Sequence, residues 1–210
     1  MKVSKKSVDF IISEEISSQA LYNQKYTGIV WPGLKSGATI GIGYDLGYVT
    51  PTDIEKDWIK EIGIDQVNIL KMFAGIRGVR AKASIAGNPL AKQVNIPYQA
   101  AYNVLTRVSL PRYAKQALRI YPGLDQLTPD AAGAIVSMVY NRGMDLVGDR
   151  REEMRNIVPL VAAKDYAGIA DQIEKSKRLW SNGLVGRREK EAAMVRGSLR
   201  QYAGDELIEL

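Results

Sequence analysis

A glycine-rich stretch of β-forming residues, SGATIGIGYDLGY at positions 36–48, constrains the fold of this chain more than any other feature of its sequence. In an extended strand, alternate residues share a face. One face of this stretch is therefore apolar and holds Ala38, Ile40, Ile42 and Tyr44. The opposite face is nearly bare and holds Thr39, Gly41, Gly43 and Asp45. A bare face lets a ligand approach closely, although the same glycines also suit tight packing or a turn.

The length of an extended strand sets a condition on Thr39 and Asp45. Six extended residues span roughly 20 Å, which is too far for both side chains to serve one bond. If the two act together, the chain must curl between them, and we expect it to do so at Gly43.

Outside residues 27–50, the only convincing sheet region, the spacing of apolar residues predicts helices. We expect them at residues 5–22, 51–61, 65–75, 97–119, 128–141, 148–163, 166–177 and 184–201. Residues 74–93 give an ambiguous pattern that suits a loop. The sequence therefore predicts an α+β fold, mainly helical, as a single domain over residues 1–210 with a small N-terminal β lobe at about 27–50 and a helical lobe at about 51–210. A groove between two such lobes suits an extended ligand.

The chain contains neither histidine nor cysteine. These absences exclude Ser-His-Asp and Cys-His catalysis, disulfides and cysteine-ligated zinc. Acid–base chemistry near neutral pH must then fall mainly to carboxylates, lysine or tyrosine. The net charge of +6 favours a polyanionic partner, such as nucleic acid, anionic lipid or an acidic cell-wall polymer, without choosing among them.

Glu15 is the first candidate for such chemistry. On a helical wheel of about 100° per residue, it lies at the centre of the apolar face that is defined by Val8, Ile11 and Ile12. A carboxyl group among apolar side chains loses hydration, which raises its pKa and lets it hold a proton near neutral pH. The alternative is a structural ion pair with one of the chain's arginines.

A glutamate on a helix, together with a threonine and an aspartate on a sheet, suggests glycoside hydrolysis. That reaction uses one protonated and one ionised carboxyl group on the two sides of the glycosidic bond.

Several stretches resemble phage-type lysozymes, the endolysin muramidases of glycoside hydrolase family 24. SEEISSQALY, residues 13–22, is similar to the family's helix in which a tyrosine follows the catalytic glutamate by seven residues, a spacing that Glu15 and Tyr22 fit. TIGIGYDLGY is similar to the family's glycine-rich strand. AAGAIVSMVYNRG and KRLWSNGLVGRREKEA, at 131–143 and 177–192, resemble two later helices. The likeness spans nearly the whole chain and implies a lysozyme-like fold.

The chain departs from the family pattern at two positions. The family's aspartate nine residues after the catalytic glutamate is Gln24 here, which cannot act as a base, and its strand histidine is Tyr44. Asp45 is similar to the aspartate of a branch that carries WPG…SG.TIG.GYDLG. The resemblance thus implies Glu15 as general acid, Thr39 as the residue that positions water, and Asp45 as the base or charge-stabilising group. Asp53 and Asp57 are alternatives to Asp45, although a helix N-terminus would explain both.

The same resemblance implies substrate contacts at Tyr22, Trp31, Tyr44, Asn141 and Arg142. Trp31 would stack on a sugar ring or act as a hydrophobic plug. Asn141 would bind an N-acetyl group or precede the helix stop at Gly143. Arg142 would meet a carboxylate of the substrate's peptide or the active-site glutamate.

The reaction so implied is hydrolysis of the β-1,4 bond between N-acetylmuramic acid and N-acetylglucosamine in peptidoglycan, with no metal or other cofactor. We expect a monomer that neither binds nucleic acid nor inserts stably into a membrane. The N-terminal apolar run is too short for a signal peptide. We therefore expect synthesis in a bacterial host cytoplasm and release to the cell wall through a holin, as for a phage or prophage endolysin. A bacteriocin or a secreted antibacterial effector is the alternative setting.

Three other functions stay open at this point. A lytic transglycosylase has the same requirement for an acid but needs no second carboxylate. A wall-binding protein that has lost catalysis would explain Gln24. A basic helical nucleic-acid binder would use the basic runs at 175–178 and 187–190, which solvated helix faces also explain.

Overall fold

The computed structural model describes residues 1–181 and 183–210. Two compact units make up this chain: one consists of Met1–Glu14 and Leu110–Leu210, and the other of Glu15–Ser109. Each is mainly helical and contains one antiparallel pair of short strands among the described residues. The predicted α+β, mainly helical composition is confirmed.

The first unit is built from a helical group and the two ends of the chain. Its helices are α1 (Lys5–Ile16, of which Glu15 and Ile16 belong to the second unit), α6 (Leu110–Ile120), α7 (Pro129–Arg142), α8 (Glu152–Ala163), α9 (Tyr166–Lys175) and α10 (Leu184–Arg196). Its strands are β1 (Lys2–Ser4) and β4 (Leu207–Glu209). Short 3-10 helices lie at Leu124–Gln126, Asp149–Arg151, Ser176–Leu179 and Gly204–Glu206.

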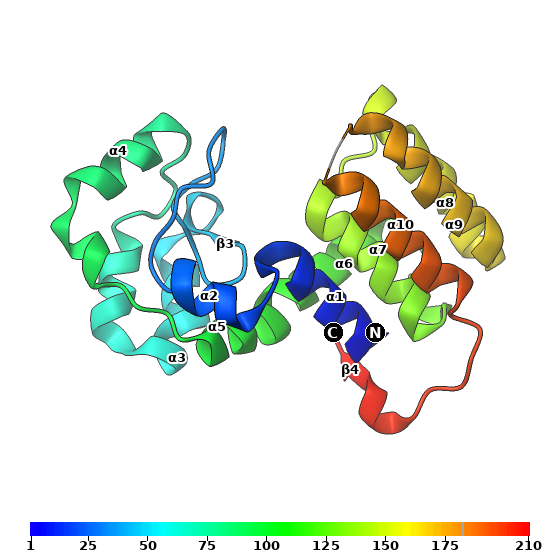
Figure 1. Cartoon of the computed structure of the whole chain (residues 1–210), viewed down its shortest axis with the longest axis horizontal. Coiled ribbons are helices and arrows are strands. Elements are labelled where there is room, and N and C mark those ends of the chain that lie inside the picture. Colours follow the sequence, from blue (N-terminus) through cyan, green and yellow to red (C-terminus); the bar gives the residue numbers. More distant parts are fainter. Residues whose placement is uncertain (182) are drawn as a thin grey trace. The chain divides into compact units, whose positions relative to one another are not determined.

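Helix α7 forms the centre of this unit, because nearly all of its side chains are buried. It contacts α6, α10 and β1, and α9 packs against both α8 and α10 (Figure 1). Pro129 begins α7 and Gly143, with φ of 74°, ends it, as the sequence predicted. Gly133 lets α1 approach closely, since a Cβ there would lie 2.0 Å from Ser7 Oγ.

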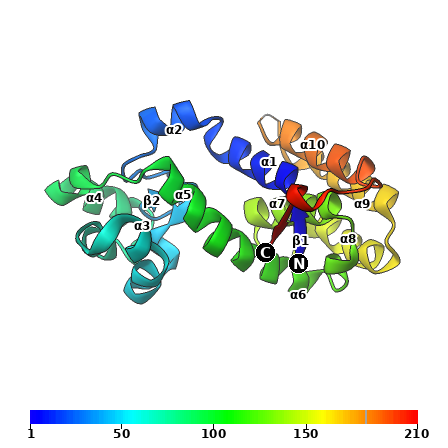
Figure 2. The same ribbon diagram turned by 90° about the horizontal axis from the view of Figure 1, so that it is seen from below.

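The two chain ends pair as β1 and β4, with Val3 opposite Ile208. Beyond them, the Leu210 N–H donates to the Met1 carbonyl at 2.8 Å. Figure 2 shows the ends side by side. The sequence pattern did not predict this sheet. Its two strands are too short to show a period-two pattern, and they lie at opposite ends of the chain.

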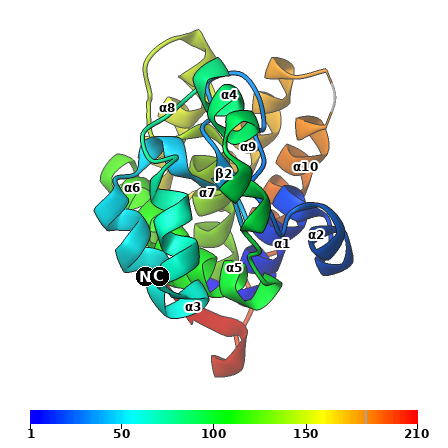
Figure 3. The same ribbon diagram turned by 90° about the vertical axis from the view of Figure 1, so that its left-hand side faces the viewer.

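The second unit combines a β-hairpin with helices. The helices are α2 (Gln19–Lys25), α3 (Pro51–Lys71), α4 (Val79–Gly87) and α5 (Tyr98–Val104), with 3-10 helices at Leu46–Tyr48 and Pro89–Gln93 and a π-helical turn at Leu105–Ser109. The strands are β2 (Thr39–Ile40) and β3 (Tyr44–Asp45). Helices α3 and α5 lie side by side, as Figure 3 shows.

The hairpin has one packed face, as its sequence predicted. Its apolar side chains are at most 4% exposed and are those of Ala38, Ile40, Ile42 and Tyr44. The Tyr44 ring meets the buried Trp58 ring edge-on, with centroids 5.3 Å apart. A Cβ at Gly41 would lie 3.0 Å from Trp58 Cη2, so glycine allows this close packing.

The curl that Thr39 and Asp45 require is confirmed: the two residues are direct partners across the hairpin. Both Gly41 (φ 57°) and Gly43 (φ 72°) take the left-handed backbone of its turn, so the reversal is shared rather than confined to Gly43.

The division into units differs from the lobes expected at 27–50 and 51–210. Residues 51–109 join the hairpin in one unit, because Trp58 of α3 packs against it. The sequence pattern showed which segments are helical but could not show which of them share a core.

Several helix boundaries also differ from the prediction. The helix expected at 5–22 breaks at Ser17, whose φ is 61°, and Ser18 then caps α2 by accepting from the Leu21 N–H. Gly63, with φ of 76°, kinks α3 in the gap predicted between 51–61 and 65–75. The ambiguous segment 74–93 contains α4. No helix in the described part of the chain is long and apolar enough to cross a membrane.

Candidate functional site

A pocket of about 410 Å³ lies within the second unit. Three segments line it: Glu15 and Ile16 at the end of α1, the loop residues Tyr26, Val30, Trp31 and Pro32, and the hairpin residues Thr39, Gly41 and Gly43. Of the residues predicted to act on a substrate, the structure brings Glu15, Thr39 and Trp31 together here. Of the two hairpin glycines, Gly43 is exposed, whereas the space where a Gly41 side chain would lie faces Trp58 in the core, so the bare face expected from the sequence is found only in part.

Glu15 is half-buried in the last turn of α1. The helix ends one residue later, because Ser17 takes a left-handed conformation and Ser18 begins the next helix. The chain therefore turns away at once, and Glu15 lines the pocket from the end of a helix.

Thr39 is 9% exposed and is fixed by hydrogen bonds on two sides. Its backbone pairs with Val30, at 2.7 Å from the Thr39 N–H and 2.9 Å to the Thr39 carbonyl. Its hydroxyl donates to the Gly37 carbonyl at 3.4 Å. A hydroxyl that donates to the protein still has lone pairs that can accept a hydrogen bond from water.

The Asp45 carboxylate is occupied by the backbone of its own loop. It accepts the Gly37 N–H at 3.0 Å and 3.1 Å, one bond to each oxygen, and the Gly47 N–H at 2.8 Å. Burial raises the pKa of Asp45 above its ordinary value, while the Gly47 and Gly37 N–H groups and the Arg77 charge act to lower it. Asp45 shares a face with Thr39 but does not line the pocket. Its contacts are those of a group that caps the following 3-10 helix.

Trp31 lines the pocket and is oriented by its own loop. Its indole N–H donates to the Ser36 carbonyl at 3.1 Å. The Lys82 ammonium lies 5.5 Å from the centre of its ring. Lys82 comes from α4, and no local sequence signal links it to Trp31. Tyr26, also in the pocket wall, was likewise not predicted.

Two of the predicted substrate-binding tyrosines lie in the core instead. Tyr22 is fully buried, and its hydroxyl donates to the Ile96 carbonyl at 3.0 Å. The Tyr44 hydroxyl donates to Asp57 Oδ2 at 2.8 Å, behind the packed face of the hairpin. Neither lines the pocket. The sequence motif that contains a tyrosine does not indicate which group its hydroxyl will hydrogen-bond in the folded protein.

The remaining candidate residues do not line the Glu15 pocket. Asn141 and Arg142 line a pocket in the first unit, whereas Glu15 belongs to the second. Asp53 forms a capping box with Thr50 at the start of α3, as a helix N-terminus would explain. Gln24 is exposed on α2 and does not line the Glu15 pocket.

Comparison of the sequence with protein-family models and with curated proteins finds no match.

Proposed function

We propose that this protein is a glycoside hydrolase with a lysozyme-like fold. The observation that carries the proposal is the pocket in which Glu15 and Thr39 lie against a wall that includes Gly41 and Gly43. With no histidine or cysteine in the chain, a carboxyl group is the natural acid for such a pocket. The exposed Gly43 in this wall allows a broad, flat ligand such as a sugar ring to approach the hairpin backbone.

The activity we propose is that of a muramidase, which cleaves the β-1,4 bond between N-acetylmuramic acid and N-acetylglucosamine in peptidoglycan. Glu15 protonates the leaving oxygen. Thr39 holds the attacking water. Asp45, whose carboxylate accepts the Gly37 and Gly47 N–H groups outside the pocket, fixes the loop beside Thr39. Trp31 supplies an aromatic surface for a sugar ring, and no cofactor takes part.

The first prediction concerns Glu15→Gln, which keeps the shape of the side chain but cannot donate a proton as an acid. We expect the clearing of a cell-wall suspension to slow by at least about 100-fold, the usual contribution of general acid catalysis. Turbidity measures the rate, and circular dichroism checks folding.

Glu14→Gln is the matched control for this substitution. Glu14 precedes Glu15 on the same helix but pairs with Lys190 at 2.9 Å and does not line the pocket. We expect Glu14→Gln to clear cell walls at close to the wild-type rate. An equal loss in both variants would contradict the assignment of Glu15.

One observation favours a second candidate, a lytic transglycosylase. Among the described residues that line the pocket, Glu15 is the only carboxylate, since Asp45 stands outside it and bonds to its own loop. A transglycosylase needs the acid alone, because the muramic acid hydroxyl replaces water as nucleophile. Its products end in anhydro-muramic acid, whereas hydrolysis leaves reducing ends, and mass spectrometry separates the two.

For the biological setting we propose a phage or prophage endolysin, made in the bacterial cytoplasm and released to the cell wall through a holin. A bacteriocin or a secreted effector would use the same chemistry. Peptidoglycan is the proposed partner, and a monomer is sufficient because the proposed acid and threonine lie in one unit of one chain.

A further inference from the structure

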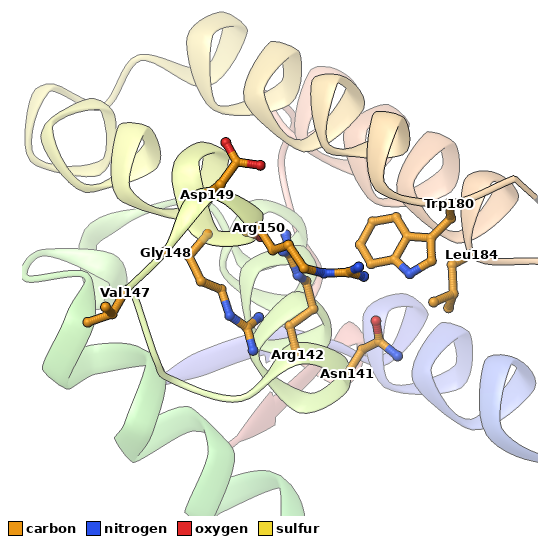
Figure 4. Close-up of a pocket in the computed structure, with 9 residues that line it drawn as sticks. Asn141, Arg142, Val147, Gly148, Asp149, Arg150, Trp180 and Leu184 are labelled. Atoms are coloured by element: carbon orange, nitrogen blue, oxygen red, sulfur yellow. The ribbon is translucent and has the colours of Figure 1, made fainter. Parts of the chain in front are cut away.

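A second pocket, of about 480 Å³, lies in the first unit at the C-terminal end of α7. It is lined by Asn141 and Arg142 of α7, by residues 147–151, which include the 3-10 helix at Asp149–Arg151, and by Trp180 and Leu184. Figure 4 shows that these residues come from three segments of the chain, with the Arg142, Arg150 and Trp180 side chains near one another. The sequence predicted Asn141 and Arg142 as substrate contacts, but the catalytic steps proposed for Glu15 and Thr39 assign this pocket no role.

Arg142 is a buried cation in the wall of this pocket. Its side chain is 9% exposed, and its guanidinium lies 5.1 Å from the centre of the Trp180 ring. Nη2 donates to the Arg150 carbonyl, whereas Nη1 has no hydrogen-bond partner among the described residues. Burial lowers the pKa of Arg142 to about 10, helped by the charges of Arg151 and Arg188, so the group is still charged near neutral pH.

A buried guanidinium without a carboxylate partner is costly, because it has lost hydration that only an anion or a full set of acceptors restores. The described residues give Arg142 a backbone carbonyl and no ion pair. The guanidinium of Arg142 in this pocket therefore has an N–H group, at Nη1, that lacks an acceptor among the described residues.

The surroundings of Arg142 add positive charge. Arg150 and Arg151 line the same pocket, and Arg188 lies 5.6 Å from the centre of the Trp180 ring. The charges of Arg151 and Arg188 act on Arg142, but Arg188 is paired with Glu191 at 3.0 Å. An anion in the pocket is therefore attracted mainly by Arg142, Arg150 and Arg151.

The neighbouring carboxylates are directed elsewhere. Asp149 and Glu152 pair with Arg178 at 3.5 Å and 3.2 Å, and Glu153 Oε1 accepts the Arg178 Nε–H. The Asp149 carboxylate points away from Arg142 and Arg150 in Figure 4. Glu153 acts on Arg142 through its charge; its Oε1 is held by Arg178, while its buried Oε2 has no hydrogen-bond partner among the described residues and makes no ion pair with Arg142.

We propose that this pocket binds an oxyanion, the carboxylate or phosphate group of a ligand, between Arg142 and the flanking Arg150 and Arg151. A guanidinium is planar and forms paired hydrogen bonds with either group. Arg142 Nη1 is buried, so its donation to such a ligand requires a change of the Arg142 rotamer. Arg150 is exposed and meets it first. The proposal does not depend on Glu15 or on any cleavage of peptidoglycan.

Calorimetric titration of the full chain at low ionic strength tests the proposal, with sodium phosphate in one arm and sodium citrate in the other. We expect saturable binding of one or both probes, and the stronger arm identifies the group. Arg150→Ala should weaken that binding by at least about tenfold, because it removes a charge-assisted hydrogen bond. Arg119→Ala on α6 removes the same charge at an exposed position outside the pocket and should leave binding unchanged.

A second readout keeps the test independent of overall charge. The indole N–H resonance of Trp180, assigned with a Trp180→Phe variant, should shift as the probe saturates the protein. Arg142→Met, checked for folding by circular dichroism, should abolish this shift. The proposal is overturned if neither probe binds saturably, or if Arg150→Ala binds as tightly as Arg119→Ala. Neither result bears on the activity proposed for Glu15.

Discussion

At the residue scale, some side chains line the Glu15 pocket and others hold its walls in place. Glu15 and Thr39 line it, whereas Asp45 binds the N–H groups of Gly37 and Gly47. The sequence could predict the first two because each lies on a face defined by local periodicity. It could not predict that the Asp45 carboxylate would be taken up by backbone donors, or that Tyr22 and Tyr44 would find partners in the core, because those bonds depend on packing.

Thr39 offers a prediction about water. Thr39→Ala removes the hydroxyl proposed to hold the nucleophile, so we expect wall clearing to slow by about tenfold, which is the order of one hydrogen bond. Thr39→Ser keeps the hydroxyl and should retain most of the rate. If Thr39→Ser is as slow as Thr39→Ala in the turbidity assay, the methyl group rather than the hydroxyl is what matters, and the proposed role is wrong.

Asp45 offers a prediction about pH. Because the pKa of Asp45 is raised in the folded protein above 3.8, its ordinary value, the folded state binds a proton more readily than the unfolded state. That contribution to stability is complete below the unfolded pKa and is lost as pH rises through the folded pKa. Asp45→Asn does not titrate. The free energy of unfolding of Asp45→Asn, measured by urea unfolding, should therefore increase relative to that of wild type as the pH rises from about 3 to about 7.

The comparison needs only the change with pH, so the fixed cost or benefit of an amide at position 45 cancels. A constant difference in unfolding free energy between Asp45→Asn and wild type over this range would show that the pKa of Asp45 is not raised by folding.

At the scale of elements, α7 is the clearest case of agreement between sequence and structure. Pro129 and Gly143 are local signals, and the helix lies between them. The terminal strands are the opposite case, because their pairing joins the two ends of the chain. Helix α1 lies between these extremes: its apolar face was predicted, but its end at Ser17 was not, since serine rarely adopts the left-handed backbone found there.

The contact between α7 and α1 predicts a steric effect. A Cβ at Gly133 would lie 2.0 Å from Ser7 Oγ and 2.3 Å from Ser7 Cβ. Gly133→Ala should therefore lower the free energy of unfolding by about 1–3 kcal/mol, as overpacking of a core does. Urea unfolding measures the change. Adding Ser7→Gly should restore part of the loss, because it removes the atoms that clash.

Gly186→Ala is the control for helix propensity. Gly186 lies within α10, and a Cβ there would meet nothing within 4 Å. Alanine should stabilise this helix by about 0.5–1 kcal/mol. If Gly133→Ala is as well tolerated as Gly186→Ala, α1 and α7 are not packed as closely as described.

At the scale of the whole molecule, the chain is two helical units with a net charge of +6. The Glu15 pocket draws its lining from residues 15–43, all within one unit. A continuous segment can carry local sequence signals, which is why this part of the site was predicted. Lys82, which reaches Trp31 from α4, carried no such signal. The expected lobes at 27–50 and 51–210 missed the actual units because the pattern of one helix does not show which neighbours share its core.

The net charge predicts a dependence on salt. A cationic protein is drawn to an anionic cell wall, and dissolved ions screen this attraction. Raising the salt from about 0.02 M to about 0.2 M should slow wall clearing several-fold, as the screening length shortens. Cleavage of an uncharged chito-oligosaccharide should change much less. An equal effect on both substrates would show that salt acts on the enzyme rather than on its approach to the wall.

The central claim is that Glu15 donates the proton that breaks a peptidoglycan bond. Mass spectrometry of purified peptidoglycan after digestion tests it most directly, with wild type, Glu14→Gln and Glu15→Gln compared at equal concentration. The account predicts muropeptides with newly formed ends from wild type and Glu14→Gln, and none above background from a folded Glu15→Gln protein. Release of the same fragments by Glu15→Gln at the wild-type rate would contradict it.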